Sequence, residues 1–222
     1  MKLKLSGVFA AIVLIASLHL QLVATAFAQE AGTRRTWSNR QITIRIHDYA
    51  QIKSAVLLQA EQSAANILKE AGVDANWVEC RVGETPSGDT ACARPMAPLD
   101  VILNLLPRSM AKRSDFRDEV FGVAVEGTEK DFGFFASVFY DKVKDCAVLE
   151  RIDLPPFLGA VMAHELGHLL LGKHSHSNAG LMRAGWSRKQ LHIAEQRGLV
   201  FAPSDARQIQ NAVVTRSLVR SH

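Results

Sequence analysis

The chain has 222 residues, of which 48% are hydrophobic and 22% are charged. This length suits one domain with a continuous core, or one domain with a small additional lobe, and the composition is that of an ordinary globular protein. Without Lys2 and Lys4, the only charged residues of an N-terminal segment treated below, the formal net charge falls from +4 to +2. A charge this small predicts that the protein has no nucleic-acid partner.

The first 28 residues have the layout of a secretory signal peptide. Lys2 and Lys4 give a positive start, segment 5–26 is almost wholly apolar, and Ala26-Phe27-Ala28 matches the small-x-small cleavage pattern. An uncleaved membrane anchor is the alternative, because the apolar run is long enough to span a bilayer. The polar segment that follows favours cleavage. We therefore expect removal of residues 1–28 and a secreted or periplasmic protein without a stable membrane anchor.

Five β-strands and a first helix are expected before Pro155. Segment 41–47 alternates isoleucines with polar residues, which is typical of a half-buried strand. Segment 54–71 has apolar residues at helical spacing, and Gly72 behind it is a residue type that commonly ends helices. Further strands are expected at 76–80, 99–106, 121–125 and 134–140.

Helices are expected over the remainder of the chain. Pro155 and Pro156 suit the first turn of a helix. The apolar residues behind them extend this helix over 157–171, and Gly172 is placed to end it. Two more helices are expected at 187–197 and 204–217.

The order of these elements predicts a single domain over residues 29–222. Its larger part, about 40–172, is expected to be an α+β unit in which a mixed β-sheet is backed by two helices. A small helical C-terminal lobe is expected to follow over about 173–222.

Three cysteines follow the expected cleavage site. Cys80 and Cys92 flank a loop that contains Gly, Pro, Ser and Thr, and export makes a disulfide permissible. A bridge between them would close a loop of about a dozen residues and leave Cys146 unpaired. The chain has no CxxC pair, so a cysteine-ligated metal site is not expected.

The expected helix 157–171 carries His164-Glu165-Leu166-Gly167-His168. Its two histidines are four residues apart, so they project from one face and can hold one metal ion. In such an HExxH arrangement the glutamate reaches a metal-bound water and acts as its general base. The alternative is an amphipathic helix with incidental histidines. Charged and titratable residues are uncommon on a buried helix, which disfavours that alternative.

Two histidines need a third protein ligand if one zinc position is to stay open for water. The segment that follows offers His174 and His176, and Met182 comes shortly after them. This stretch resembles the metzincin peptidases, whose pattern HExxHxxGxxH precedes a turn that contains methionine. His174 takes the third histidine position of that pattern. The match departs at Leu171, where the pattern has glycine, because the glycine of this chain is Gly172.

Over nearly its whole length after the leader, the chain also resembles a loose group of secreted bacterial proteins regarded as metallopeptidases. Their layout, HExxHLLLGxxSHSxxGIM with WxxC upstream, places the third histidine on His176. The resemblance implies a metzincin-like fold in which the active-site helix precedes a Met-turn. It also implies that Zn²⁺ is held by His164, His168 and either His176 or His174. We favour His176, because the displaced glycine leaves the other candidate close to the helix end.

Motif and resemblance together predict an exported zinc-dependent peptidase that hydrolyses peptide or protein substrates, with Glu165 as general base. One alternative is a non-catalytic exported zinc-binding protein that keeps the fold for partner binding, a role for which Glu165 has no use. A second alternative is a thermolysin-like ligand set in which Glu195 is the third ligand. His47 and His192 are expected not to be ligands, and Trp186 is expected to cover the core beside Met182.

Overall fold

A computed structural model describes residues 40–83, 92–111, 120–125, 127, 133–173, 175–196 and 198–219. The chain divides into two units, Met1–Asn39 and Arg40–His222, and only the second contains described residues. The expected signal peptide, 1–28, therefore lies outside the described residues. Among the described residues, no helix combines the length and the apolar character that crossing a membrane requires.

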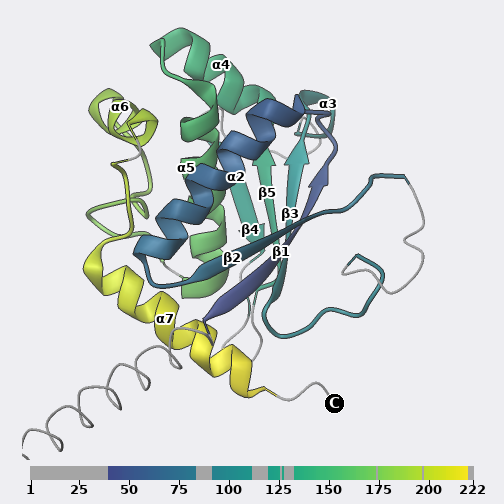
Figure 1. Ribbon diagram of the computed structural model, residues 1–222. Helices are drawn as coiled ribbons and strands as arrows, with labels where there is room; N and C mark the ends of the chain where they lie inside the picture. Colours follow the sequence, from purple (N-terminus) through teal and green to yellow (C-terminus); the bar gives the residue numbers. More distant parts are fainter. Residues whose placement is uncertain are drawn as a thin grey trace, which may run out of the picture. The chain divides into compact units, whose positions relative to one another are not determined.

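A five-stranded sheet in the order β2-β1-β3-β5-β4 is the framework of the second unit (Figure 1). Its strands are β1 (Gln41–Asp48), β2 (Asp74–Glu79), β3 (Asp100–Leu106), β4 (Gly122–Val125) and β5 (Phe135–Phe139). Four of them run parallel, and β4 pairs antiparallel with β5 at one edge. Every expected strand is present, and the predicted mixed sheet is mostly parallel.

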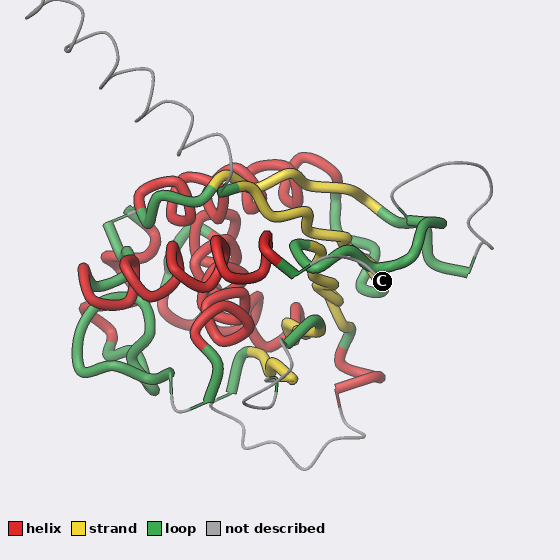
Figure 2. The backbone as a smooth tube through the Cα atoms, turned by 90° about the horizontal axis from the view of Figure 1, so that it is seen from below, coloured by secondary structure: helices red, strands yellow, loops and turns green. Residues whose placement is uncertain are grey.

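Two long helices, α2 (Ser54–Glu70) and α5 (Leu154–Leu171), contact each other along the sheet (Figures 1 and 2). The other helices are α3 (Arg108–Ala111), α4 (Tyr140–Glu150), α6 (Arg188–Glu195) and α7 (Pro203–Leu218). The expected helices at 54–71, 157–171, 187–197 and 204–217 correspond to α2, α5, α6 and α7. The unit therefore has the predicted combination of a mixed sheet and packed helices.

Helix α4 is absent from the sequence prediction, which extends the last strand to Tyr140 and leaves the next residues unassigned. Within α4 only Val143 and Ala147 are buried. Two apolar contacts four residues apart give too weak a periodic signal for a helix to be recognised. The residue after this helix, Arg151, has a left-handed conformation with φ 57°, a conformation that often ends a helix.

The hydrophobic core lies between the sheet and the two long helices. Because alternate residues of a strand face opposite sides, Ile42, Ile44 and Ile46 of β1 point to the same side and are fully buried. Paired residues of β3 share that side, and they join one cluster with apolar residues of α2 and α5. The alternation in segment 41–47 therefore marks the core-facing side correctly.

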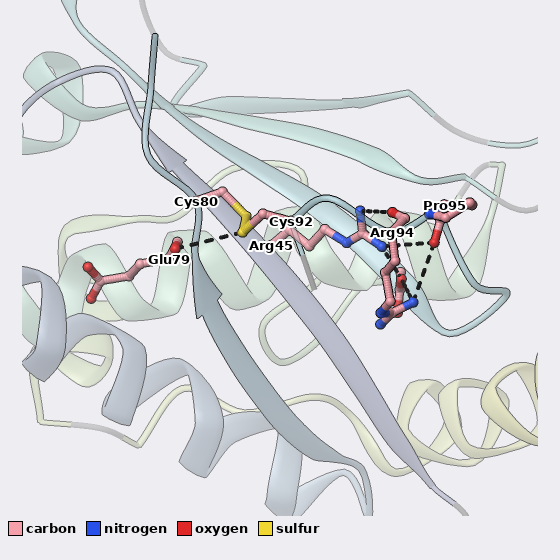
Figure 3. The surroundings of a disulfide bond; sticks show 7 residues. Arg45, Glu79, Cys80, Cys92, Arg94 and Pro95 are labelled. Atoms are coloured by element: carbon pink, nitrogen blue, oxygen red, sulfur yellow. Dashed lines mark hydrogen bonds and ion pairs between the residues drawn. A yellow bond between two sulfur atoms is a disulfide. The ribbon is translucent and has the colours of Figure 1, made fainter. Parts of the chain in front are cut away.

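The other side of β1 carries Arg45, which the half-buried strand pattern predicts to face solvent. Its side chain is instead 5% exposed. The guanidinium donates to the Asp100 carboxylate at 2.6 Å and to the backbone carbonyls of Arg94 and Pro95 (Figure 3). The segment 92–100, some fifty residues later in the chain, therefore covers this side of the sheet. Strand periodicity alone does not reveal such a cover.

The predicted Cys80–Cys92 disulfide is present and anchors this covering segment (Figure 3). Cys80 follows the end of β2, so the bridge ties the start of the segment to the sheet, while Asp100 ties its end to Arg45. Cys146 is not in a disulfide, as expected.

Gly159 marks a close approach of α5 to α2. A Cβ atom at this position would lie 2.5 Å from the carbonyl oxygen of Ala60 and 2.6 Å from the Cβ of Ser63. We expect Gly159→Ala to lower the free energy of unfolding by about 1–3 kcal/mol, because the helices must separate. Urea denaturation measures this loss. Gly185→Ala is the matched control, since no atom lies within 4 Å of its added Cβ; equal stability of both variants would contradict the prediction.

Glu61 of α2 gives a pH-dependent contribution to stability. Its side chain is buried, and no hydrogen-bond partner for its Oε1 exists within the described parts of the chain. Burial, together with the like charge of Glu79, raises the pKa of this carboxyl from 4.5 to about 7. The folded state therefore binds the proton more tightly than the unfolded state, and stability falls as the pH rises from 4.5 to about 7.

Removing this carboxyl should reveal the effect. We expect Glu61→Gln to match the wild type below pH 4.5 and to be more stable by about 1–3 kcal/mol above pH 7. Denaturant titrations between about pH 4 and pH 8 measure the difference. Glu70→Gln, an exposed position of the same helix, is the control. A stability gain that is constant with pH, or that shrinks as the pH rises, would argue against the assignment.

Candidate metal centre

Helix α5 holds the HExxH residues on a rigid element. It begins with two prolines in its first turn and ends at Gly172, whose φ of 78° favours glycine. It contacts strands β3, β4 and β5 as well as helices α2, α4, α6 and α7. Packing on so many sides leaves the helix little freedom to move, so the side chains it projects have defined positions.

Three imidazole rings converge at this helix. His164 and His168 come from α5 and are half-buried, and His176 comes from the loop behind it and is exposed. One ring nitrogen of each lies within 4.8 Å of the other two. The Nε2 atoms of His164 and His168 are 3.1 Å apart. His174, the other candidate, lies outside the described residues.

The opposite ring nitrogens of the two helical histidines have hydrogen-bond partners. His164 Nδ1–H donates to the backbone carbonyl of Leu181 at 2.8 Å, and His168 Nδ1 is 2.7 Å from the hydroxyl of Ser175. Because a carbonyl oxygen only accepts, His164 carries its proton on Nδ1 and has a lone pair on Nε2. Outer partners of this kind orient the imidazoles that bind metals.

This set of donors fits a zinc ion. Two nitrogens bound to one tetrahedral zinc at roughly 2.0–2.1 Å would lie about 3.3 Å apart, close to the 3.1 Å between the two Nε2 atoms. Burial, with a contribution from the neighbouring imidazole His176, lowers the pKa of His164 to about 4 and that of His168 to about 3. Both rings are therefore neutral at physiological pH, which is the form that binds metal.

Glu165 is buried beside the imidazoles and lies against the edge strand β4. A Cβ atom at Gly122 would come within 2.7 Å of the Cδ and Oε1 atoms of Glu165. Any larger residue at this position would displace the carboxyl group. Burial raises the pKa of Glu165 to about 8.

A cavity of about 410 Å³ opens over these groups. Strand β4 and the two residues before it form one wall, α5 forms another, and loop residues 183–186 complete it. Glu165 and all three imidazoles line the cavity. Most of the other lining residues are apolar, which is the usual character of a ligand pocket.

The loop that follows α5 packs against the helix and against His164. Met182 is fully buried, and its Sδ lies 2.5 Å from where a Cβ on Gly167 would stand. Trp186 donates its indole N–H to the Leu181 carbonyl at 3.1 Å, the same oxygen that holds His164. Its ring meets the His164 ring edge-on, with centroids 5.6 Å apart. Trp186 thus lines the cavity, in addition to the expected packing against the core.

The remaining candidates lie elsewhere. Glu195, the alternative third ligand, accepts a hydrogen bond from the backbone N–H of Asp153 at 2.8 Å, and its other oxygen is 3.4 Å from His192. His47 lies on β1 beside Tyr49. Within the described residues, none of these side chains joins the three converging imidazoles.

Four residues of the site were not assigned to it from the sequence: Gly122, Ser175, Arg183 and Trp186. Gly122 comes from a strand some forty residues before the motif, and no local pattern links it to Glu165. Ser175 and Trp186 are close to the motif in sequence, and the loop conformation decides their contacts. Arg183 directly follows Met182, and that adjacency is the signal from which it could have been found.

No protein-family model matches the chain, and no curated protein matches it significantly. Among solved structures, the crystal structure of archaemetzincin from Methanopyrus kandleri is similar, with a TM-score of 0.47 and 17% sequence identity. The match covers 79% of this chain and 97% of the archaemetzincin chain.

Proposed function

We propose that this chain is an exported zinc-dependent peptidase in which His164, His168 and His176 hold the metal and Glu165 is the general base. The observation that supports this most strongly is the convergence of three imidazole nitrogens beside a buried carboxyl group in an open cavity. Bound zinc would supply Lewis acidity, which lowers the pKa of water and of neighbouring acids and polarises a substrate carbonyl.

Glu165 would move the proton in this reaction. In its ionised form the carboxylate accepts a proton from the attacking water and then delivers it to the nitrogen of the departing amine. Its position against Gly122 holds the carboxyl in one place, so the proton acceptor does not need to be ordered when substrate binds.

Strand β4 supports a peptide as substrate. In the described part of the chain it pairs with β5 on one side only, and the cavity opens along it. The unpaired backbone groups of an edge strand are suited to pair with an extended peptide, whose scissile bond would then lie over α5. The apolar wall formed by Val123 and Val125 suits side chains of such a peptide.

Export is supported by two independent features. Residues 1–28 have the layout of a signal peptide, and a structural disulfide such as Cys80–Cys92 is typical of proteins in oxidising compartments. Together they favour a periplasmic or extracellular location for the enzyme.

Metal analysis combined with a peptide-library digest tests the proposal. We expect about one zinc per purified chain, cleavage of library peptides, loss of cleavage on chelation and recovery on adding zinc. Bound zinc without cleavage of any peptide would favour the non-catalytic zinc-binding protein. A chain that binds no zinc would contradict the proposal.

A further inference from the structure

Arg183 places a positive charge on the cavity wall. Among the described lining residues it is the only lysine or arginine, and it shares the cavity with the three imidazoles and Glu165. The other lining residues are glycine, alanine, valine, phenylalanine and tryptophan. A single fixed positive charge in such apolar surroundings acts strongly on any anion that enters.

The backbone at Arg183 is held in place. The preceding Met182 is fully buried, and its carbonyl accepts a hydrogen bond from the backbone N–H of Ser177 at 2.8 Å. Leu181 donates its backbone N–H to the carbonyl of Val200 at 2.8 Å. These contacts fix the residues just before Arg183. The Arg183 side chain therefore starts from a defined backbone position beside the metal centre.

Among the described residues, the Arg183 side chain has a neutral hydrogen-bond partner and no counter-ion. One guanidinium N–H donates to the backbone carbonyl of Asn178. Within the described residues no carboxylate lies at ion-pair distance from it, and its buried Nε has no hydrogen-bond partner. By contrast, Arg45, the buried arginine of β1, is paired with Asp100. Within the described part of the chain, the charge of Arg183 is therefore not neutralised by a carboxylate, and a bound ligand can supply one.

We propose that Arg183 determines substrate specificity by binding a carboxylate of the peptide substrate near the scissile bond. A guanidinium presents two parallel N–H groups that match a carboxylate, which makes arginine suited to this role. The carboxylate is either the side chain of Asp or Glu or a free C-terminus. This inference rests on the proposed peptidase function, since it concerns the same cavity.

Binding of peptide hydroxamates tests the inference without requiring turnover. A hydroxamate chelates zinc, so calorimetry on the zinc-loaded full chain reports affinity directly. One pair of probes differs only by Asp against Asn, with an amidated end, and the second only by a free or an amidated C-terminus. We expect the wild type to bind the carboxylate member of one pair about 10- to 100-fold more tightly. The pair that discriminates identifies the source of the carboxylate.

Three variants test whether Arg183 causes the preference for the carboxylate probe. Arg183→Gln should remove the preference while zinc content and affinity for the neutral probes stay unchanged, and Arg183→Lys should keep part of it. Arg188→Gln is the matched control, because that exposed arginine pairs with Glu150 and should leave the preference intact. The preference is a ratio within one protein, so a general loss of affinity in a variant does not affect it.

Two results would overturn the inference. In the first, the wild type binds both members of each pair equally. In the second, Arg183→Gln weakens charged and neutral probes by the same factor, which would assign Arg183 a general role at the reaction centre. Failure of every hydroxamate to bind a zinc-loaded chain, or absence of zinc, would instead contradict the metal centre on which the inference depends.

Discussion

Glu165→Gln is expected to bind zinc like the wild type and to hydrolyse peptides about 10²–10⁴-fold more slowly. Glutamine has the size and shape of glutamate, so it fits the space against Gly122 that the carboxyl occupies. It has no site that can accept and return a proton at neutral pH. The fall should therefore appear in kcat, while metal content and the affinity of a chelating inhibitor stay the same.

The control for this variant is Glu61→Gln, which also replaces a buried glutamate by glutamine but lies outside the cavity. It should hydrolyse the same peptide at the wild-type rate. If Glu165→Gln turned over substrate as fast as the wild type, the general base would have to be another residue. If it lost zinc, Glu165 would belong to the ligand set.

His176→Ala is expected to weaken zinc binding by more than about 100-fold, the upper range for loss of an outer partner of a metal ligand. The reason is that only two imidazoles would remain, both on α5, and they approach the metal from one side. Competition with a chromophoric chelator measures the change. His47→Ala, a histidine of β1 outside the group of three, is the control and should have no effect.

His174→Ala separates the two candidates for the third ligand. We expect it to weaken zinc binding far less than His176→Ala does. A larger effect at His174 would reverse the assignment and leave the metal centre intact. Equal affinity in the wild type and both variants would show that the loop supplies no ligand.

The residues of this site that share one helix could be predicted from the sequence, and those whose contacts depend on the packing of segments far apart in the sequence could not. His164, Glu165 and His168 were identifiable because a helix places residues four apart on one face, whatever surrounds it. The third histidine depends on how the chain turns after Gly172, and the departure from the metzincin spacing left two possibilities. Gly122 could not be assigned to the site from the sequence, because its contact with Glu165 depends on how β4 packs against α5.

The same distinction holds for the fold. Strand β1 and helix α2 were predictable because their apolar residues recur with a clear period, and α5 because a long apolar run lies between two prolines and Gly172. Arg45 was misjudged, since its burial depends on a segment some fifty residues later that folds over it. Helix α4 was missed because it buries only Val143 and Ala147 and therefore has little periodicity.

The two walls of the cavity differ in how many substitutions they can tolerate. This difference affects how the protein can diverge in evolution. Helix α5 lies in the core and also carries His164 and His168, so substitutions at its buried positions would destabilise the fold and disturb the site together. The facing wall, β4 and loop residues 183–186, contributes little to the core. Related chains can therefore acquire new substrate preferences by changing that wall at positions other than Gly122 and Trp186, which contact Glu165 and His164, while the chemistry on α5 is inherited unchanged.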